Sequence, residues 1–98
     1  MNREIVLRPR AEVETREAFE WYERQAPGLG WEFLRSVDAS LQSIRRDPNL
    51  HPIVWQDVRR ALVRRFPYQI FFVLEEKSVV VLAVLHAKRD PKNWPPRV

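Results

Sequence analysis

The sequence predicts an α+β fold in which one strand, two helices and three strands follow one another, β-α-α-β-β-β. Two observations carry this prediction: an amphipathic helical stripe near the middle of the chain, and two long apolar runs near its end, at 68–74 and 79–85. The chain has 98 residues, which is enough for one modest hydrophobic core. We therefore expect a single domain over 1–98, with 93–98 as a tail.

The N-terminal quarter of the chain predicts a strand and a first helix. The short apolar run EIVLR at 4–8 ends at Pro9, and a proline fits the opening turn of a helix because its missing N–H would have no partner there. From Ala11 to about Gln25 the chain is rich in Glu and Arg, with apolar residues near helical spacing. The segment APGLG at 26–30 ends this helix.

A second helix is indicated by apolar residues on one helical stripe, which Asp47-Pro48 terminates. They are Phe33, Leu34, Val37, Leu41 and Ile44. The three later strands form an antiparallel meander, with the polar EEK at 75–77 as the turn between the last two. The helix pair covers one face of this small antiparallel sheet, so apolar residues on the other face need cover from a partner or from the tail.

The first strand of the meander carries four arginines in VRRALVRRFPY. Strict alternation places Arg60 and Arg64 on one face and Arg59 and Arg65 on the other. They either solvate an edge strand or meet an anionic partner. We expect Arg60 and Arg64 to bind the partner, and we keep Arg65 because Pro67 removes a backbone donor and can shift the alternation.

The composition favours a cytoplasmic protein with an anionic partner. Residues 1–50 carry a net charge of −1 and residues 51–98 one of +5, which suggests nucleic acid, the ribosome or an acidic protein segment. There is no cysteine, and the charged N-terminus is not a signal peptide. The longest apolar run is too short to cross a bilayer, and two histidines without paired acids give no metal site. We expect no cofactor, no metal and no membrane contact.

Four segments, in this order and spacing, resemble the RelE/ParE superfamily of toxins from bacterial type II toxin–antitoxin modules: WYE at 21–23, LGWEFL at 29–34, VRRALVRRFPYQI at 58–70 and VLHAKRDP at 84–91. The resemblance runs from about residue 5 to 94. It implies a helical hairpin on one face of a small antiparallel sheet. It also implies a toxin that halts growth until a cognate antitoxin wraps an extended or helical segment around it. A homo-oligomer and a hetero-oligomer with the antitoxin both stay open.

Two activities occur in this superfamily. RelE-like members cut messenger RNA on the ribosome, and ParE-like members inhibit DNA gyrase. Metal-independent cleavage needs an acid, a base and cations near the phosphate, for which the candidates are Arg60, Arg64, Arg65, His86 and Arg89. RelE-like members tend to carry several lysines or an acid in the middle strands and an aromatic hydroxyl near the C-terminus. This chain has no lysine before Lys77 and no tyrosine after Tyr68, and its VLH strand end is similar to ParE-like members, so gyrase inhibition is favoured and enzymatic activity stays open.

The surface expected to bind the target or the antitoxin gathers basic and aromatic residues of the second half: Arg59, Arg60, Arg64, Arg65, Phe66, Tyr68, His86, Lys88, Arg89 and Trp94. Several have a structural interpretation as well. His86 can hold a backbone group at the strand end, the spacing of Phe66 and Tyr68 indicates packing, and Trp94 can pack back on the sheet. A third function is a non-toxic module that binds nucleic acid, whose affinity would fall steeply with salt.

Overall fold

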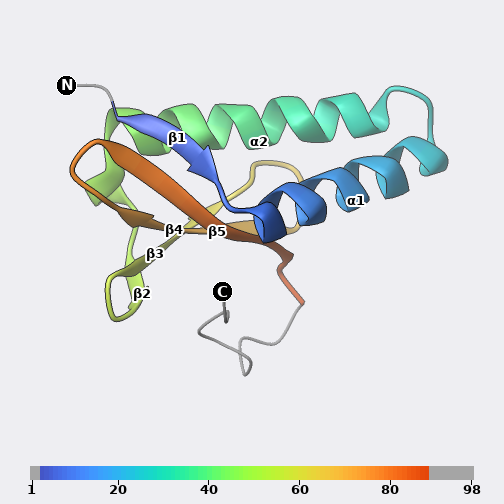
Figure 1. Cartoon of the computed structure of the whole chain (residues 1–98). Helices are drawn as coiled ribbons and strands as arrows, with labels where there is room; N and C mark the ends of the chain where they lie inside the picture. Colours follow the sequence, from blue (N-terminus) through green and yellow to red (C-terminus); the bar gives the residue numbers. More distant parts are fainter. Residues whose placement is uncertain (1–2, 89–98) are drawn as a thin grey trace.

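A computed structural model describes residues 3–88 of the chain. The elements run along it as shown in Figure 1: β1 (Glu4–Leu7), α1 (Pro9–Gln25), α2 (Leu29–Arg46), the short 3-10 helix η1 (Pro48–Leu50), β2 (Ile53–Trp55), β3 (Val58–Leu62), β4 (Tyr68–Leu74) and β5 (Ser78–His86). The predicted α+β class is confirmed, and so is the order of the predicted elements. β2 is an additional short strand that the sequence analysis did not predict.

The two helices form a hairpin that a single carboxylate ties together. Glu23 of α1 accepts the backbone N–H groups of Gly28 and Gly30, both at 2.9 Å, and so satisfies donors at the start of α2 that have no partner within the helix. Gly28 has a φ of 89°, which glycine adopts without strain. Gly30 allows the helices to approach closely, because a Cβ there would lie 2.6 Å from the backbone oxygen of Phe19.

The sheet has five strands in the order β1-β5-β4-β3-β2. Its four later strands pair antiparallel, and β3, β4 and β5 among them form the predicted meander, but β1 pairs parallel to β5, with Glu4 opposite Ser78 and Leu7 opposite Val81. The sheet is therefore mixed, whereas the sequence analysis described it simply as antiparallel. The direction of β1 depends on the long connection through both helices, and parallel strands need such a crossover. No local pattern in the sequence reports it.

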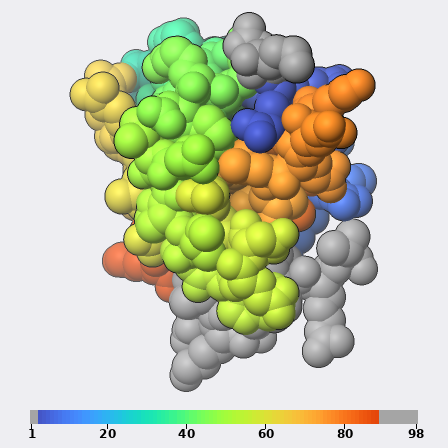
Figure 2. Space-filling model, turned by 90° about the vertical axis from the view of Figure 1, so that its left-hand side faces the viewer, coloured from blue at the N-terminus to red at the C-terminus, as the bar shows by residue number. Residues whose placement is uncertain are grey.

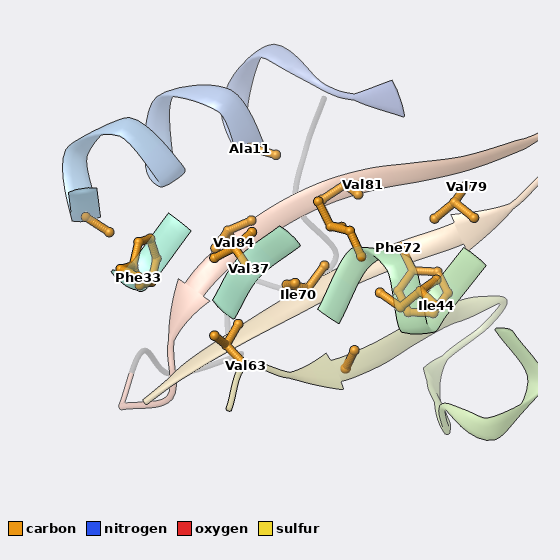
Figure 3. Packing of buried hydrophobic residues seen from close by; sticks show 13 residues of the cluster. Ala11, Phe33, Val37, Ile44, Val63, Ile70, Phe72, Val79, Val81 and Val84 are labelled. Carbon is orange, nitrogen blue, oxygen red and sulfur yellow. The ribbon is translucent and has the colours of Figure 1, made fainter. Parts of the chain in front are cut away.

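The main core lies between the helix hairpin and one face of the sheet (Figures 1 and 3). The stripe predicted for α2 is confirmed, since Phe33, Val37, Leu41 and Ile44 are all buried. Figure 3 shows Phe33, Val37 and Ile44 of α2 against residues of the strands. The buried strand residues of this core are Ala61, Val63, Ile70, Phe72, Val79, Val81 and Val84. The first helix adds small residues, Ala11 and Ala18, so α1 can lie close to β5.

The second face of the sheet carries a smaller apolar cluster. Val58, Phe71 and Ala83 are buried there, and the half-buried side chains packed against them are Trp55, Val73, Leu82 and Leu85. A bulge between Phe71 and Phe72 shifts the register with β5. At the sheet edge, the segment around β2 lies at the surface, in the yellow-green lower part of the view in Figure 2. Apolar side chains are exposed there: Leu50 (73%), Ile53 (55%) and Val54 (39%).

Candidate functional site

Only two of the four arginines predicted for the first meander strand lie in that strand. β3 ends at Leu62, so Arg64 and Arg65 lie in the turn to β4, and both are exposed. Arg60 and Arg64 therefore do not lie on one face of a strand, and the prediction that they share a face was wrong. Buried Val63 closes the strand onto the main core, and Arg65 takes a left-handed backbone with a φ of 69°. Such a conformation is uncommon for a residue with a side chain.

The two arginines that do lie within β3 point to opposite faces, as predicted. Arg59 donates from Nη1 to the backbone oxygen of His51 at 2.7 Å, which fixes the loop before β2. Arg60 lies on the second face, with Nη1 at 3.4 Å from Oε1 of Gln69, a long and weak hydrogen bond. Arg59 therefore has a structural contact to maintain, whereas Arg60 is held loosely.

The turn arginines are the more available cations. Nη2 of Arg65 lies 3.5 Å from Oε1 of Glu32, and both side chains are largely exposed, at 70% and 46%. An exposed pair of this kind contributes about 0–1 kcal/mol, so a partner can displace it at little cost. Within residues 3–88, Arg64 makes no hydrogen bond or ion pair. Its guanidinium is free to bind a carboxylate or a phosphate through two parallel hydrogen bonds.

An aromatic cluster supports this turn from beneath. Phe66 packs on Tyr22 with ring centroids 5.0 Å apart, and Tyr68 packs on Phe33 at 5.0 Å. Burial, with a smaller contribution from the neighbouring Tyr68 hydroxyl, raises the pKa of Tyr22 above its ordinary value. Phe66 and Tyr68 are both half-buried against the main core. They hold the turn in place, in agreement with the packing role that their spacing indicated.

The end of β5 is joined to the same turn. Ala87 donates its backbone N–H to the oxygen of Pro67 at 2.6 Å, and the His86 ring lies 5.2 Å from that of Tyr68. Nδ1 of His86 accepts the backbone N–H of Lys88 at 3.0 Å, so in the neutral ring the proton sits on Nε2. This end of the sheet carries three exposed cations, Arg64, Arg65 and Lys88. We call it the basic end. The expected site residues Arg89 and Trp94 lie outside the described residues.

Beside the basic end an open groove of about 590 Å³ runs between α1 and the end of β5. Its walls are Glu14, Glu17, Ala18, Trp21, Tyr22, Pro67, Tyr68, Val84, Leu85 and His86. Glu14 is occupied structurally, because Oε1 accepts the N–H of Val84 at 2.8 Å and Oε2 pairs with Arg10 at 3.0 Å. Glu17 is exposed and is therefore the carboxylate that can act on a ligand together with His86.

The sequence analysis did not single out Glu14 and Glu17 as site residues. A signal was present, because Glu14, Glu17 and Trp21 recur at steps of three and four and so share one face of α1. What the pattern does not report is that this face lies beside the end of β5, nearly seventy residues later. Trp21 is 50% exposed there, and Trp31, on the other helix, is 56% exposed and packs edge-on against Phe19.

His51 is the other histidine, and it does not join the groove. Its Nε2 is buried without a hydrogen-bond partner among the described residues, and its ring lies 5.8 Å from Phe72. Burial lowers the pKa of His51, the charge of Arg59 lowers it further, and Asp47 opposes both. Within residues 3–88 no three potential ligands gather in a way that would hold a metal ion, and no helix there is long and apolar enough to cross a membrane.

A helical hairpin on one face of a mixed five-stranded sheet is the RelE/ParE type of fold. The chain matches the family described as the ParE toxin of the type II toxin-antitoxin system, parDE, over residues 5–91. It therefore belongs to the ParE toxin family. A search among curated proteins found no significant relative.

Two solved structures have a similar fold. The chromosomal ParDE toxin–antitoxin system from P. aeruginosa contains a chain with a TM-score of 0.75 and 14% identity, over 86% of this chain and 95% of that one. The toxin-antitoxin complex RelBE2 from Mycobacterium tuberculosis contains one with a TM-score of 0.62 and 15% identity, over 88% and 99%. At these identities the likeness concerns the fold alone.

Proposed function

We propose that this ParE-family toxin arrests bacterial growth by inhibiting DNA gyrase, and that a cognate antitoxin neutralises it in the cytoplasm. The family match over residues 5–91 is the observation that carries the proposal. The basic end supports it, because Arg64 and Arg65 in the turn before β4 and Lys88 after β5 are exposed cations at one end of the sheet. Such a surface binds an anionic partner by charge complementarity without needing proton-transfer groups.

The second face and the basic end together suit an antitoxin. An apolar segment of the antitoxin can contact Leu62, which is 65% exposed on this face, while acidic residues beside it meet Arg60 and Arg64. Buried apolar area supplies most of the affinity in such a contact, and the charges supply orientation and association rate. The two structural neighbours are described as toxin–antitoxin systems or complexes, which supports a partner of this kind for the present chain.

Cleavage of messenger RNA on the ribosome is the second candidate function. The groove supports RNA cleavage, because His86 and the exposed carboxylate of Glu17 line the same space. Cutting RNA without a metal needs both an acid and a base. Arg64 or Arg65 would then stabilise the charge that develops on the phosphate. These residues make the two candidate functions separable by mutation.

The proposal is tested with the purified full-length chain in two assays, gyrase supercoiling and cleavage of ribosome-bound messenger RNA. We expect gyrase inhibition without RNA cleavage, and relief of that inhibition by the antitoxin. The Arg64→Ala and Arg65→Ala variants should inhibit gyrase more weakly, whereas Glu17→Gln and His86→Gln should inhibit like the parent.

Loss of RNA cleavage by about 100-fold or more in Glu17→Gln and His86→Gln, with gyrase unaffected by the parent chain, would instead establish the ribonuclease. A folded, soluble chain that leaves growth unchanged on induction would contradict both activities. Binding to nucleic acid that falls steeply with salt, without growth arrest, would then indicate the non-toxic module.

A further inference from the structure

The groove between α1 and the end of β5 is acidic, although the chain as a whole is basic. The sequence has a formal net charge of +4, yet the described residues that line the groove include no lysine or arginine, and they include Glu14 and Glu17. Glu14 is already held by Arg10 and by the N–H of Val84. The carboxylate of Glu17 is exposed and makes no hydrogen bond or ion pair within residues 3–88. Glu17 therefore gives the groove an available negative charge.

Aromatic rings line the same groove. Trp21 stands four residues after Glu17 on α1, so the two side chains are neighbours on one face of the helix, and Trp21 is 50% exposed. The ring of Tyr22 lies edge-on to Trp21 with centroids 5.1 Å apart, and Tyr68 lies edge-on to Tyr22 at 6.1 Å. The face of an aromatic ring attracts a cation, and it does so most strongly for an indole. A carboxylate beside an exposed indole therefore suits a cation with a planar body.

The edge of β5 beside the groove is open at its end. β1 pairs with β5 only as far as Val81, so among the described residues no strand lies beside the later part of β5 on that side. Val84 turns its N–H to the open side, where a glutamate of α1 accepts it, whereas Ala87 turns its N–H the other way, to the turn before β4. Because backbone groups alternate along a strand, the N–H and C=O of His86 lie on the open side. An extended peptide can pair with such an edge.

We propose that this groove binds an arginine side chain on an extended segment of a partner protein. The guanidinium pairs with the carboxylate of Glu17 and stacks on the indole of Trp21, while the peptide backbone pairs with His86 at the open edge. Arginine fits better than lysine, because its planar, weakly hydrated guanidinium stacks on a ring and bonds a carboxylate at the same time. Acidic residues of the same partner on the basic end would fix its orientation. The site is a property of the chain by itself and holds whichever target the toxin has.

Nuclear magnetic resonance titration of the isotope-labelled full-length chain tests the site. The probe is a blocked glycine peptide with one central arginine, and its control carries citrulline, which has nearly the same shape without the charge. We expect the arginine peptide to shift the indole N–H of Trp21, assigned by its loss in Trp21→Phe, and to bind at least about fivefold more tightly than the citrulline peptide. The indole of Trp31, 56% exposed outside the groove, should not shift. Equal affinities, or no shift at Trp21, would overturn the proposal. Methylguanidinium that binds as tightly as the arginine peptide would also overturn it, because the peptide backbone would then contribute nothing.

Two variants of α1 identify the carboxylate that binds the arginine. Glu17→Gln should weaken binding of the arginine peptide about threefold to fivefold and leave binding of the citrulline peptide nearly unchanged. Glu20→Gln is the matched control, because Glu20 is also exposed on α1 but does not line the groove. This variant should bind the arginine peptide like the parent. Equal weakening by both substitutions would assign the effect to the net charge of the helix and would contradict the proposal.

Discussion

The two faces of the sheet differ in how they are covered. On one face, α1 and α2 enclose Phe72, Ile70, Val79 and Val81 at 0% exposure. On the other, a smaller cluster around Phe71 is bordered by exposed Leu62 (65%) and by the loosely held Arg60. The first face has the composition and packing of a core that the helices complete. The second carries an exposed leucine beside a cation, so we expect the binding surface on this face and most of the stability to come from the first.

The largest expected difference in stability between the two faces comes from replacing two neighbouring phenylalanines, Phe72 and Phe71. Phe72→Ala should reduce the free energy of unfolding by about 3–5 kcal/mol, because two helices and a sheet cannot collapse onto the cavity. Phe71→Ala should cost roughly half as much, since the smaller cluster can relax around the loss. Urea denaturation of both variants measures the two values. An equal or larger cost for Phe71→Ala would show that the second face is packed as tightly as the first.

The same contrast explains what the sequence could predict. The stripe from Phe33 to Ile44 and the apolar runs of β4 and β5 follow from local periodicity, which reports burial directly. The parallel pairing of β1 with β5 depends on a crossover of two helices, and β2 is three residues long, so neither leaves a periodic pattern. For the site, alternation separated Arg59 from Arg60 correctly. It failed at Arg64 because β3 ends at Leu62 and Arg64 lies in the turn to β4, where alternation no longer applies.

Replacing Arg59 and replacing Arg64 should change the free energy of unfolding by different, intermediate amounts. Arg59→Ala removes the hydrogen bond to the backbone oxygen of His51 and should cost about 1–2 kcal/mol. Arg64→Ala changes an exposed turn residue and should stay within about 0.5 kcal/mol of the parent. We expect the reverse order for toxicity, with Arg64→Ala relieving growth arrest while its melting temperature is unchanged. A destabilised Arg64→Ala would assign that arginine to the fold instead of the binding surface.

The smallest expected effect is the pH dependence that His51 gives to stability, and the direction of this dependence follows from the groups around its ring. Burial against Phe72 and the charge of Arg59 lower its pKa in the folded chain, while Asp47 pulls in the other direction. The folded state therefore favours the neutral ring, and its contribution to stability is present above the ordinary histidine pKa of about 6.5. As the pH falls below that value, the unfolded chain takes up the proton first and the contribution is lost down to the folded pKa. The free energy of unfolding, measured from pH 8 to pH 5, should thus decline more steeply for the parent than for His51→Gln, which has no imidazole to protonate. Parallel curves would contradict the prediction and would mean that Asp47 offsets burial completely.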